Sequence, residues 1–463
     1  MALSSSIGAG LLLSTSQSLA VGGPAPLFMA FAIVGLAVWI SMCSLGELST
    51  NFPNKGSFYE YSVRFISPAW GFSMGWNYAI NFIFIVPFEL IVMVMCARYW
   101  NPEIPAYYLL PIFLLGLVLI YAFGAEWYAE AENFFGICKM LVLTTFVLTA
   151  ILIATHSIPS DKRPQNEVGV DLWKHEAFKN NGPGFLFTFM AAGMAYGGTE
   201  MMGFTAAESK DPRRVMRLAS YLVFGRIVLF YLLPTLMLGF VLKISLDPNS
   251  SEQAMISPFV QAVKEASIPV LLDIMNAIII VSIFSMASAG IFASSRSIRA
   301  ISAAGMGPKF CTKLYKGRPV GALAVVFFFS LLAFVKAAPQ GDQVFHWLLA
   351  LASASNYFTW GSICLAQIRC RLAIQKRGLD VGDVLSYQSP FGIWGSVIAI
   401  LVFGFGLVAQ VVAAFKSPLV NPPPAFASML GIVVVFVFWA GYTLIKDRRT
   451  FIVPLDRIDL EGK

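Results

Sequence analysis

Charged residues are scarce in this chain: lysine, arginine, aspartate and glutamate together make up 12% of its 463 residues. Soluble globular domains average about 25%, so a large water-exposed domain is excluded. Hydrophobic residues make up 57% of the chain, and apolar runs of about 20 residues, the length that spans a bilayer as a helix, recur along it. The composition therefore predicts an all-α integral membrane protein with many spans.

Histidine and cysteine are also rare, with three histidines and six cysteines. The cysteines lie singly, mostly inside apolar runs, without the spacing of metal ligands or of a disulfide framework. No cluster of histidine, cysteine and carboxylate residues suggests a catalytic site. We therefore expect no enzyme activity, no metal ion and no cofactor. The net charge of +7 is spread over loops and the C-terminal tail, which indicates membrane topology rather than nucleic-acid binding.

The first residues form an apolar segment that is interrupted by glycine and that lacks both a basic region and a cleavage site. It therefore does not match a signal peptide. The segment is typical of the second half of a broken helix, with residues 4–10 as its unwound part. On this interpretation the first helix is incomplete and the chain is truncated at its N-terminus.

The remaining apolar segments predict a series of membrane helices, at about residues 26–48, 70–98, 105–123, 133–155, 190–208, 218–242, 269–301, 321–335, 344–372, 391–415 and 424–445. With the incomplete first helix this makes about 12 spans, which we assign to one transmembrane domain over residues 1–463. Most lysine and arginine residues fall on one side of this arrangement, so the C-terminus is predicted to be cytoplasmic.

One predicted helix, Met190–Glu208, carries two adjacent glycines, Gly197 and Gly198, followed by Glu200. Each glycine costs about 1 kcal/mol in a helix interior, and a carboxylate is expensive in lipid. We expect this helix to break here, as the first helix does at Gly8. Corresponding breaks in two halves of a chain indicate an inverted-repeat transporter with its substrate site at the breaks. The alternative is close helix packing at the glycines, with Glu200 capping a neighbouring helix.

Ten short motifs occur along the chain in a distinctive order: IGAG at 7–10, GGPA at 22–25, SLGEL at 44–48, GFSMGWNY at 71–78, PFEL at 87–90, GTE at 198–200, AAESKDPR at 206–213, SPFVQA at 257–262, ASSR at 293–296, and HWLL with WGSICLAQIRCR within 346–371. Together they resemble the amino acid–polyamine–organocation transporters, and within them the fungal amino acid permeases. The resemblance implies a LeuT-like fold, with residues 1–155 and 184–372 as two five-helix inverted repeats and residues 391–445 as two peripheral helices. It also implies amino acid import across the plasma membrane, coupled to protons as symport.

The resemblance further implies where a substrate amino acid binds. Backbone groups freed at the first break would hold its carboxylate, and those at the second break would hold its amine. The residues concerned are Ser6, Ile7, Gly8, Ala9 and Gly10 for the carboxylate, and Ala195, Tyr196 and Gly197, with the adjacent Gly198, for the amine. Tyr196 would also gate or shape the pocket from outside. Gly197 stands where the family usually has serine, which leaves the side-chain specificity open.

Several polar residues inside predicted spans are candidates for proton coupling. Lys139 matches a lysine that, in proton-coupled relatives, takes the place of a sodium ion. Ser285 and Ser288 share a helix face and would line the same place, and Glu89 and Glu200 are further candidates. Each candidate also has a structural alternative. Lys139 could bond to helix carbonyl groups, and the two serines could be ordinary small residues in helix packing. The two glutamates could hold helices together by hydrogen bonds, which is the role we favour for Glu200.

Two other charged residues, Glu47 and Arg226, are predicted to lie near the cytoplasmic side in gating or structural ion pairs.

Two other functions remain open on the same scaffold: an amino acid sensor that does not transport, and an inactive truncated permease. Sensors of this kind signal through long cytoplasmic tails, whereas the tail here, Lys446–Lys463, is short. We therefore favour transport, with amino acids, protons and the lipid bilayer as the partners.

Overall fold

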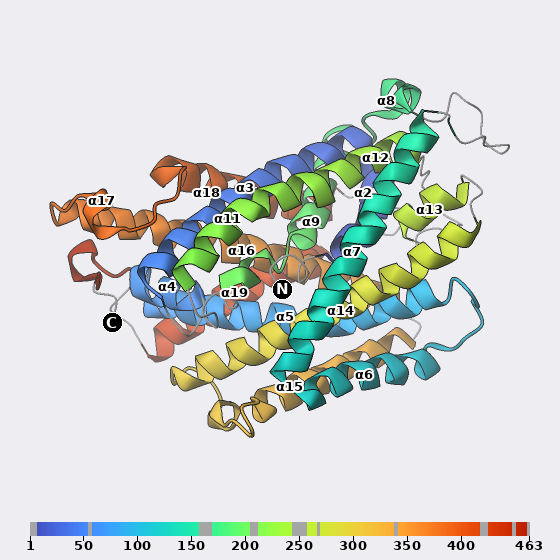
Figure 1. Cartoon of the computed structure of the whole chain (residues 1–463). Helices are drawn as coiled ribbons and strands as arrows, with labels where there is room; N and C mark the ends of the chain where they lie inside the picture. The colour runs from blue at the N-terminus through green and yellow to red at the C-terminus, as the bar shows by residue number, and fades with distance from the viewer. Residues whose placement is uncertain are drawn as a thin grey trace.

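The computed structural model describes residues 7–53, 58–155, 157, 169–203, 212–242, 257–265, 269–337, 341–416, 425–446 and 451–460. All regular elements in these ranges are helices, which confirms the all-α class. Seven helices of the described ranges are long and apolar enough to cross a membrane. Figure 1 shows the long helices gathered into one bundle, with α7 crossing the face nearest the viewer.

The helices follow the predicted order closely. The first part contains α1 (Ala9–Leu12), α2 (Ser14–Gly22), α3 (Pro24–Asn51), α4 (Phe58–Phe65), α5 (Pro68–Ala97), α6 (Ala106–Phe123) and α7 (Ala125–Ala154). The middle part contains α8 (Val170–Glu176), α9 (Asn181–Ala195), η2 (Thr199–Met201), α11 (Pro212–Ile227), the π-helical η3 (Val228–Leu232), α12 (Leu233–Val241) and α13 (Pro258–Glu265). The last part contains α14 (Pro269–Ala303), η5 (Lys309–Thr312), α15 (Val320–Ser330), η6 (Leu331–Ala337), α16 (Gly341–Lys376), α17 (Val381–Val384), α18 (Gly392–Phe415), α19 (Ala425–Ile445) and η7 (Leu455–Arg457).

Three helices, α7, α9 and α11, begin six or more residues earlier than predicted. Helix α7 begins at Ala125 rather than at residue 133, because the carboxylate of Glu132 is buried inside the protein and so does not have to lie outside the membrane span. Helix α9 begins at Asn181 rather than at residue 190. Its first turn contains Pro183, and a proline is well tolerated there because the first backbone N–H groups of a helix have no intrahelical partner.

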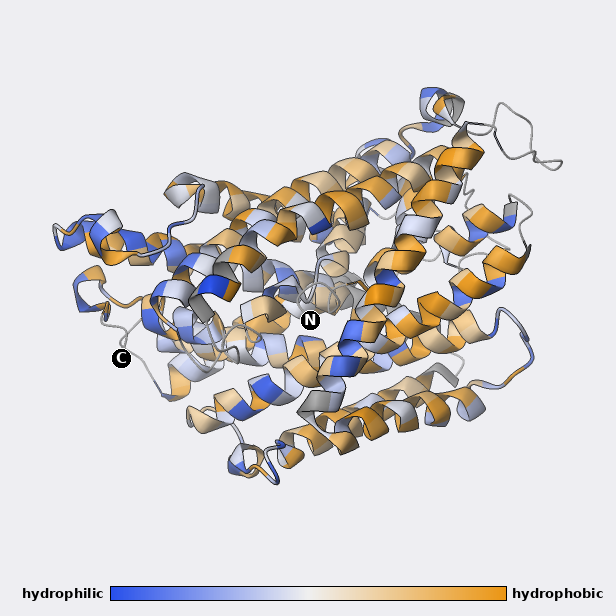
Figure 2. Cartoon of the chain, in the orientation of Figure 1, coloured by the Kyte–Doolittle hydropathy of each residue, from blue (hydrophilic) through white to orange (hydrophobic). Residues whose placement is uncertain are grey.

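Hydrophobic residues dominate the long helices, and hydrophilic residues gather at the ends of the bundle, around α17 and α4 and around α8 (Figure 2). Small residues let the central helices approach closely. A Cβ atom on Gly290 of α14 would lie 3.3 Å from Val86 of α5, and one on Gly75 of α5 would lie 3.1 Å from Ile301 of α14. Small residues at such interfaces are typical of helix packing in membranes.

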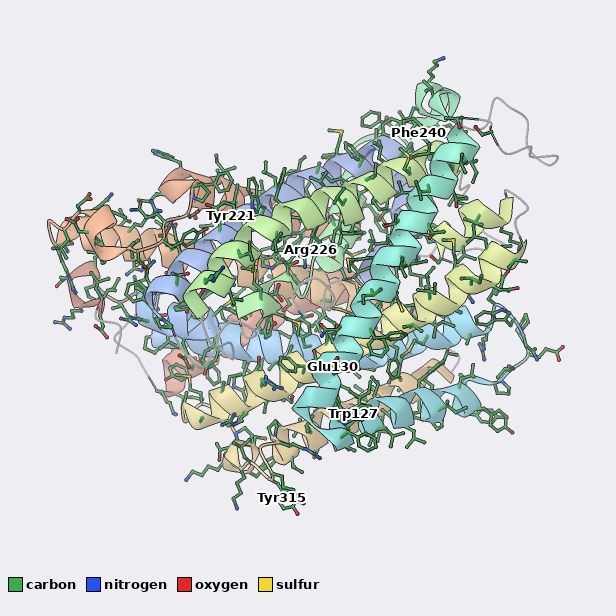
Figure 3. The ribbon with its side chains drawn as sticks, viewed as in Figure 1. Trp127, Glu130, Tyr221, Arg226, Phe240 and Tyr315 are labelled. Atoms are coloured by element: carbon green, nitrogen blue, oxygen red, sulfur yellow. The ribbon has the colours of Figure 1, made fainter. Side chains whose placement is uncertain are left out.

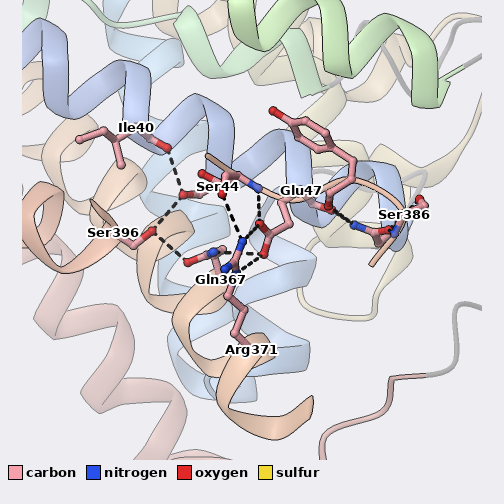
Figure 4. A network of polar contacts seen from close by, with 10 residues as sticks. Ile40, Ser44, Glu47, Gln367, Arg371, Ser386 and Ser396 are labelled. Atoms are coloured by element: carbon pink, nitrogen blue, oxygen red, sulfur yellow. Dashed lines mark hydrogen bonds and ion pairs between the residues drawn. The ribbon is translucent and has the colours of Figure 1, made fainter. Parts of the chain in front are cut away.

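A buried polar network joins α3, α16 and the connection between α17 and α18 at one end of the bundle (Figure 4). The Glu47 carboxylate accepts two hydrogen bonds from Arg371, with Nε to Oε1 at 2.8 Å and Nη2 to Oε2 at 2.6 Å. It also accepts from the backbone N–H of Ser389 at 2.5 Å and from Gln367 Nε2 at 3.0 Å. Ser396 Oγ donates in turn to Gln367 Oε1 at 2.9 Å. The predicted ion pair at Glu47 is thus confirmed, with Arg371 as its partner.

Replacement of Arg371 with methionine is expected to lower the free energy of unfolding by about 3–5 kcal/mol, because it leaves a buried carboxylate without its cation. The Glu47 side chain is only 1% exposed. Denaturant or thermal unfolding of the purified protein in detergent measures the effect. Lys376→Met is the control on the same helix, because the pair of Lys376 with Asp456 is exposed and exposed ion pairs contribute little to stability. Equal effects of the two substitutions would contradict the prediction.

Candidate functional site

The first helix break is predicted at Gly8, and the described residues begin at Ile7, so the structure shows how the chain enters α1. Gly8 has an extended backbone, with φ −144° and ψ −156°, and its carbonyl oxygen accepts hydrogen bonds from Leu11 N at 3.2 Å and Leu12 N at 3.0 Å. These bonds close the first turn of α1, so Ala9 and Gly10 are helical rather than unwound as predicted. Ile7 and Gly8 belong to the non-helical part, whereas Ser6 lies outside the described residues.

The second predicted break is confirmed after Ala195, where α9 ends. Tyr196, Gly197 and Gly198 form a turn before the short helix η2 begins at Thr199. Gly198 has φ +89° and ψ −8°, a left-handed conformation that glycine adopts without the steric cost a Cβ atom would bring. Glycine at position 198 therefore suits the left-handed backbone conformation that this turn requires.

The fold brings the two breaks into direct contact. A Cβ atom on Gly10 would lie 2.9 Å from Ala195 Cα and 3.0 Å from Ala195 N. Because these atoms belong to the backbone, they cannot move aside as a flexible side chain could. A Cβ atom on Gly8 would meet Met286 Cγ at 2.6 Å and Glu89 Oε1 at 2.8 Å. The first break is therefore enclosed by α9, α14 and α5, and only residues without bulky side chains fit there.

Glu200 holds the second break in shape. Its Oε1 accepts from Gly198 N at 3.2 Å, and its Oε2 accepts from Trp360 Nε1 of α16 at 2.9 Å. Glu200 is completely buried, so these bonds satisfy a carboxylate that would otherwise be costly inside the protein. This arrangement supports the structural role favoured for Glu200.

Arg226 lies at the second break. Its Nη2 donates to Thr199 Oγ1 at 2.6 Å, and Figure 3 shows it near the middle of the line formed by α11, η3 and α12. The sequence predicts a span from residue 218. Helix α11 begins at Pro212, so Arg226 lies about four turns into it.

Tyr196 turns toward α3 and the π-helical segment η3. Its hydroxyl donates to the carbonyl oxygen of Phe31 at 2.9 Å, and its ring stacks on that of Tyr231 with centroids 4.5 Å apart. The side chain is fully buried. These contacts fix the ring against two neighbouring elements beside the break.

Two asparagines that the sequence reasoning missed connect the second break to other helices. Asn356 of α16 donates from Nδ2 to the carbonyl oxygen of Gly193 at 3.0 Å and accepts at Oδ1 from Asn81 of α5 at 2.9 Å. A Cβ atom on Gly197 would lie only 2.5 Å from Asn356 Nδ2. The missing side chain at Gly197 thus leaves room for this amide. Asparagine in an otherwise apolar span was the available signal, since such residues often form interhelical hydrogen bonds.

Glu89 of α5 lies at the first break. Both of its carboxylate oxygens are 3.3 Å from the backbone nitrogen of Ala9, which donates to them. The charge of Glu89 also interacts with that of Lys139 on α7, whose side chain is completely buried. The structure therefore brings together two of the predicted coupling residues and one of the predicted substrate-binding residues.

Ser285 faces α7 with its side chain, and Ser288 contacts α6 through its backbone. Ser285 Oγ donates to Glu132 Oε1 at 3.0 Å, and the carbonyl oxygen of Ser288 accepts from the Tyr121 hydroxyl at 2.6 Å. Glu132 was missed because the predicted span began one residue after it. The available signal was its position seven residues before Lys139, which places both on one face of a helix. Glu200, by contrast, belongs to the separate set of contacts around Trp360.

The chemistry that this arrangement offers is hydrogen bonding and exchange of protons. Freed backbone groups lie at both breaks, and ionisable side chains lie beside the first. Within the described ranges, no three side chains of histidine, cysteine, aspartate or glutamate are grouped so as to hold a metal ion.

Sequence similarity to known proteins extends over both helix breaks. The sequence model of the amino acid permease family matches residues 1–451. An uncharacterized amino-acid permease of Schizosaccharomyces pombe is 36% identical over 471 residues, which span 100% of this chain and 79% of that protein. Cationic amino acid transporter 1 of the same organism is 34% identical over 471 residues, spanning 99% and 79%. Amino-acid permease GAP3 of Candida albicans is 35% identical over 474 residues, spanning 100% and 78%.

Proposed function

The chain belongs to the amino acid permease family, and we propose that it imports amino acids across the plasma membrane with protons by alternating access. The observation that carries the proposal is the contact between the two helix breaks, where a Cβ atom on Gly10 would lie 2.9 Å from Ala195 Cα. Broken helices that meet inside a membrane protein are how secondary transporters form a substrate site.

The proposed substrate site uses the groups freed at both breaks. The carboxylate of the amino acid binds at Ile7–Gly10, with Ser6 as a further candidate, and its amine binds at Ala195–Gly198. In the structure the N–H of Ala9 donates to Glu89. A substrate carboxylate that uses this N–H has to replace Glu89 there, which gives a direct link between the ionisation of Glu89 and substrate binding.

The proposed coupling site consists of Lys139, Glu89, Ser285 and Ser288. Its support is that Lys139 is buried and that its charge interacts with Glu89, which contacts the first break. A change in protonation at this place alters the electrostatic contacts of α7 with α5. Such a change can shift the balance between outward-open and inward-open states by the difference in its interaction with the two states.

Uptake of labelled amino acids into fungal cells that lack their own permeases tests the proposal. We expect accumulation above the external concentration, and its loss when a proton ionophore is added. The panel should include cationic amino acids, because one relative carries that class in its name. Uptake that reaches only equilibrium would reject proton coupling, and binding of amino acids without any uptake would favour the sensor function.

We also propose that the end of the bundle carrying α17 and residues 451–460 faces the cytoplasm. Arg64, Lys376 and Arg377 lie there in contact with the C-terminal segment, and basic residues are enriched on the cytoplasmic side of membrane proteins. Figure 1 shows the connection between α14 and α15 toward this same end.

A cysteine introduced at Lys313, in the connection between α14 and α15, is therefore expected to react with a membrane-impermeant maleimide only after the cells are opened. A cysteine at Glu103, in the connection between α5 and α6, serves as the control and should react in intact cells, since both positions are exposed. The unsubstituted protein gives the background of its own six cysteines. Labelling at position 313 in intact cells would reverse the proposed orientation.

A further inference from the structure

Glu132 on α7 is a buried carboxyl group that is only partly satisfied. Its side chain is 1% exposed. Ser285 Oγ of α14 donates to Oε1 at 3.0 Å, whereas Oε2 is buried and has no hydrogen-bond partner among the described residues. Burial of a carboxylate oxygen without a partner is unfavourable. Oε2 can therefore accept a proton without the loss of an existing hydrogen bond.

Lys139 is the cation that this carboxyl group faces along its own helix. It follows Glu132 by seven residues, or about two helical turns, so the two lie on one face of α7. Side chains on a helix lean toward its N-terminus, which directs Lys139 back toward Glu132. The charge of Lys139 interacts with Glu132 and with Glu89 of α5. One buried ammonium group thus serves two buried carboxyl groups on two helices.

The other ionisable groups around this set come from α6 and α14. Tyr121 of α6 donates its hydroxyl hydrogen to the carbonyl oxygen of Ser288 and interacts with the charges of Glu132 and Arg296. Arg296 of α14 is placed over the ring of Phe292, 3.5 Å from its centroid. The set of Glu89, Glu132 and Lys139 carries one negative charge in excess when all three are ionised, and one added proton makes it neutral.

We propose that Glu132 is the binding site of the coupling proton, an assignment that rests on the proposed proton-coupled transport. The proton adds to the carboxylate at Oε2 and leaves Lys139 and Glu89 as a balanced pair. Its release restores the ionised carboxylate, which takes up the interaction with Lys139 along α7 and keeps the hydrogen bond from Ser285 of α14. Binding and release thereby change the contacts of α7 with both α5 and α14, which pack against the first helix break. A charge inside a membrane protein is costly, so the neutral set is the form suited to movement between states.

Glu132→Gln mimics the protonated carboxyl group and provides the main test. We expect the internal concentration of amino acid to fall to the external value and uptake to become independent of external pH. Exchange of labelled for unlabelled amino acid across the membrane should persist, because the remaining pair is neutral. Glu130→Gln on the same helix is the matched control, since Glu130 is exposed and labelled on α7 in Figure 3. It should leave accumulation and the pH profile unchanged.

Ser285→Ala gives a second readout that does not depend on how well Glu132→Gln folds. The Ser285 hydroxyl stabilises the ionised carboxylate by hydrogen bonding. Ser285→Ala removes this hydrogen bond from the carboxylate, so the dependence of uptake on external pH should shift. Accumulation by Glu132→Gln with an unchanged pH profile, or an unshifted profile in Ser285→Ala, would overturn the assignment of Glu132. If uptake by the unsubstituted protein does not respond to a proton ionophore, the proposed proton coupling itself is rejected. That result is distinct from one that rejects only the assignment of Glu132.

Discussion

Replacement of Gly198 with leucine is expected to abolish amino acid uptake while the protein still reaches the plasma membrane. Gly198 has φ +89° in the turn between α9 and η2, and a residue with a Cβ atom pays about 1–2 kcal/mol to adopt a left-handed conformation. Its N–H also donates to Glu200. A leucine there forces the turn to change, which moves the backbone groups proposed to bind the amine. Labelled uptake normalised to surface abundance measures the effect.

Gly225→Leu is the matched control for this prediction. Gly225 lies on α11, and a Cβ atom there would meet nothing within 4 Å. The same substitution should therefore leave uptake close to that of the unsubstituted protein. Normal uptake by Gly198→Leu at matched surface abundance would remove the second break from the substrate site.

The second large effect is expected for Lys139→Ala, which should lose accumulation against a gradient and lose dependence on external pH while still binding substrate. Lys139 is completely buried, and its charge interacts with Glu132 and Glu89. Its removal leaves two buried carboxyl groups without this cation and so changes the electrostatic balance between the two states. Each change of about 1.4 kcal/mol between two states shifts their ratio tenfold, so loss of this interaction is enough to uncouple uptake.

Uptake at several external pH values, together with substrate binding to the purified protein, checks this expectation. Lys313→Ala is the control, because that lysine is exposed in the connection between α14 and α15. If Lys139→Ala still concentrates amino acid with an unchanged pH profile, Lys139 is a structural residue.

Local properties of the sequence were sufficient to predict the helices and the break after Ala195. The cost of adjacent glycines in a helix interior predicted the interruption found at Tyr196–Gly198. At Gly8 the structure shows an extended residue before α1, and the predicted first half of that helix lies outside the described residues. Helix ends were less predictable where polar residues begin a helix. The sequence predicted loops at Glu132, in the third turn of α7, and at Pro183, in the first turn of α9, although the protein buries the former and tolerates the latter.

The contacts of the candidate site could be predicted only in part. Lys139 and Glu89 were both candidates, but nothing in the sequence indicated that Glu89 would bind the N–H of Ala9, 80 residues away. Trp360 and Asn356 were not recognised as partners of the second break, although Trp360 lies 160 residues beyond Glu200 and bonds to it. Such pairs depend on which helix faces meet, and a single sequence does not contain that information.

The sequence by itself determined the class of the protein, the order of its helices and the point after Ala195 where a helix breaks. These follow from transfer of apolar residues into the membrane and from backbone preferences, both of which act over a few neighbouring residues. Only the tertiary structure decided that the breaks touch at Gly10 and Ala195, that Arg226 lies beside the second break, and that Glu132 joins Lys139. The reason is that a buried polar group must find its partner inside the protein, and the packing of distant helices determines which partner it finds.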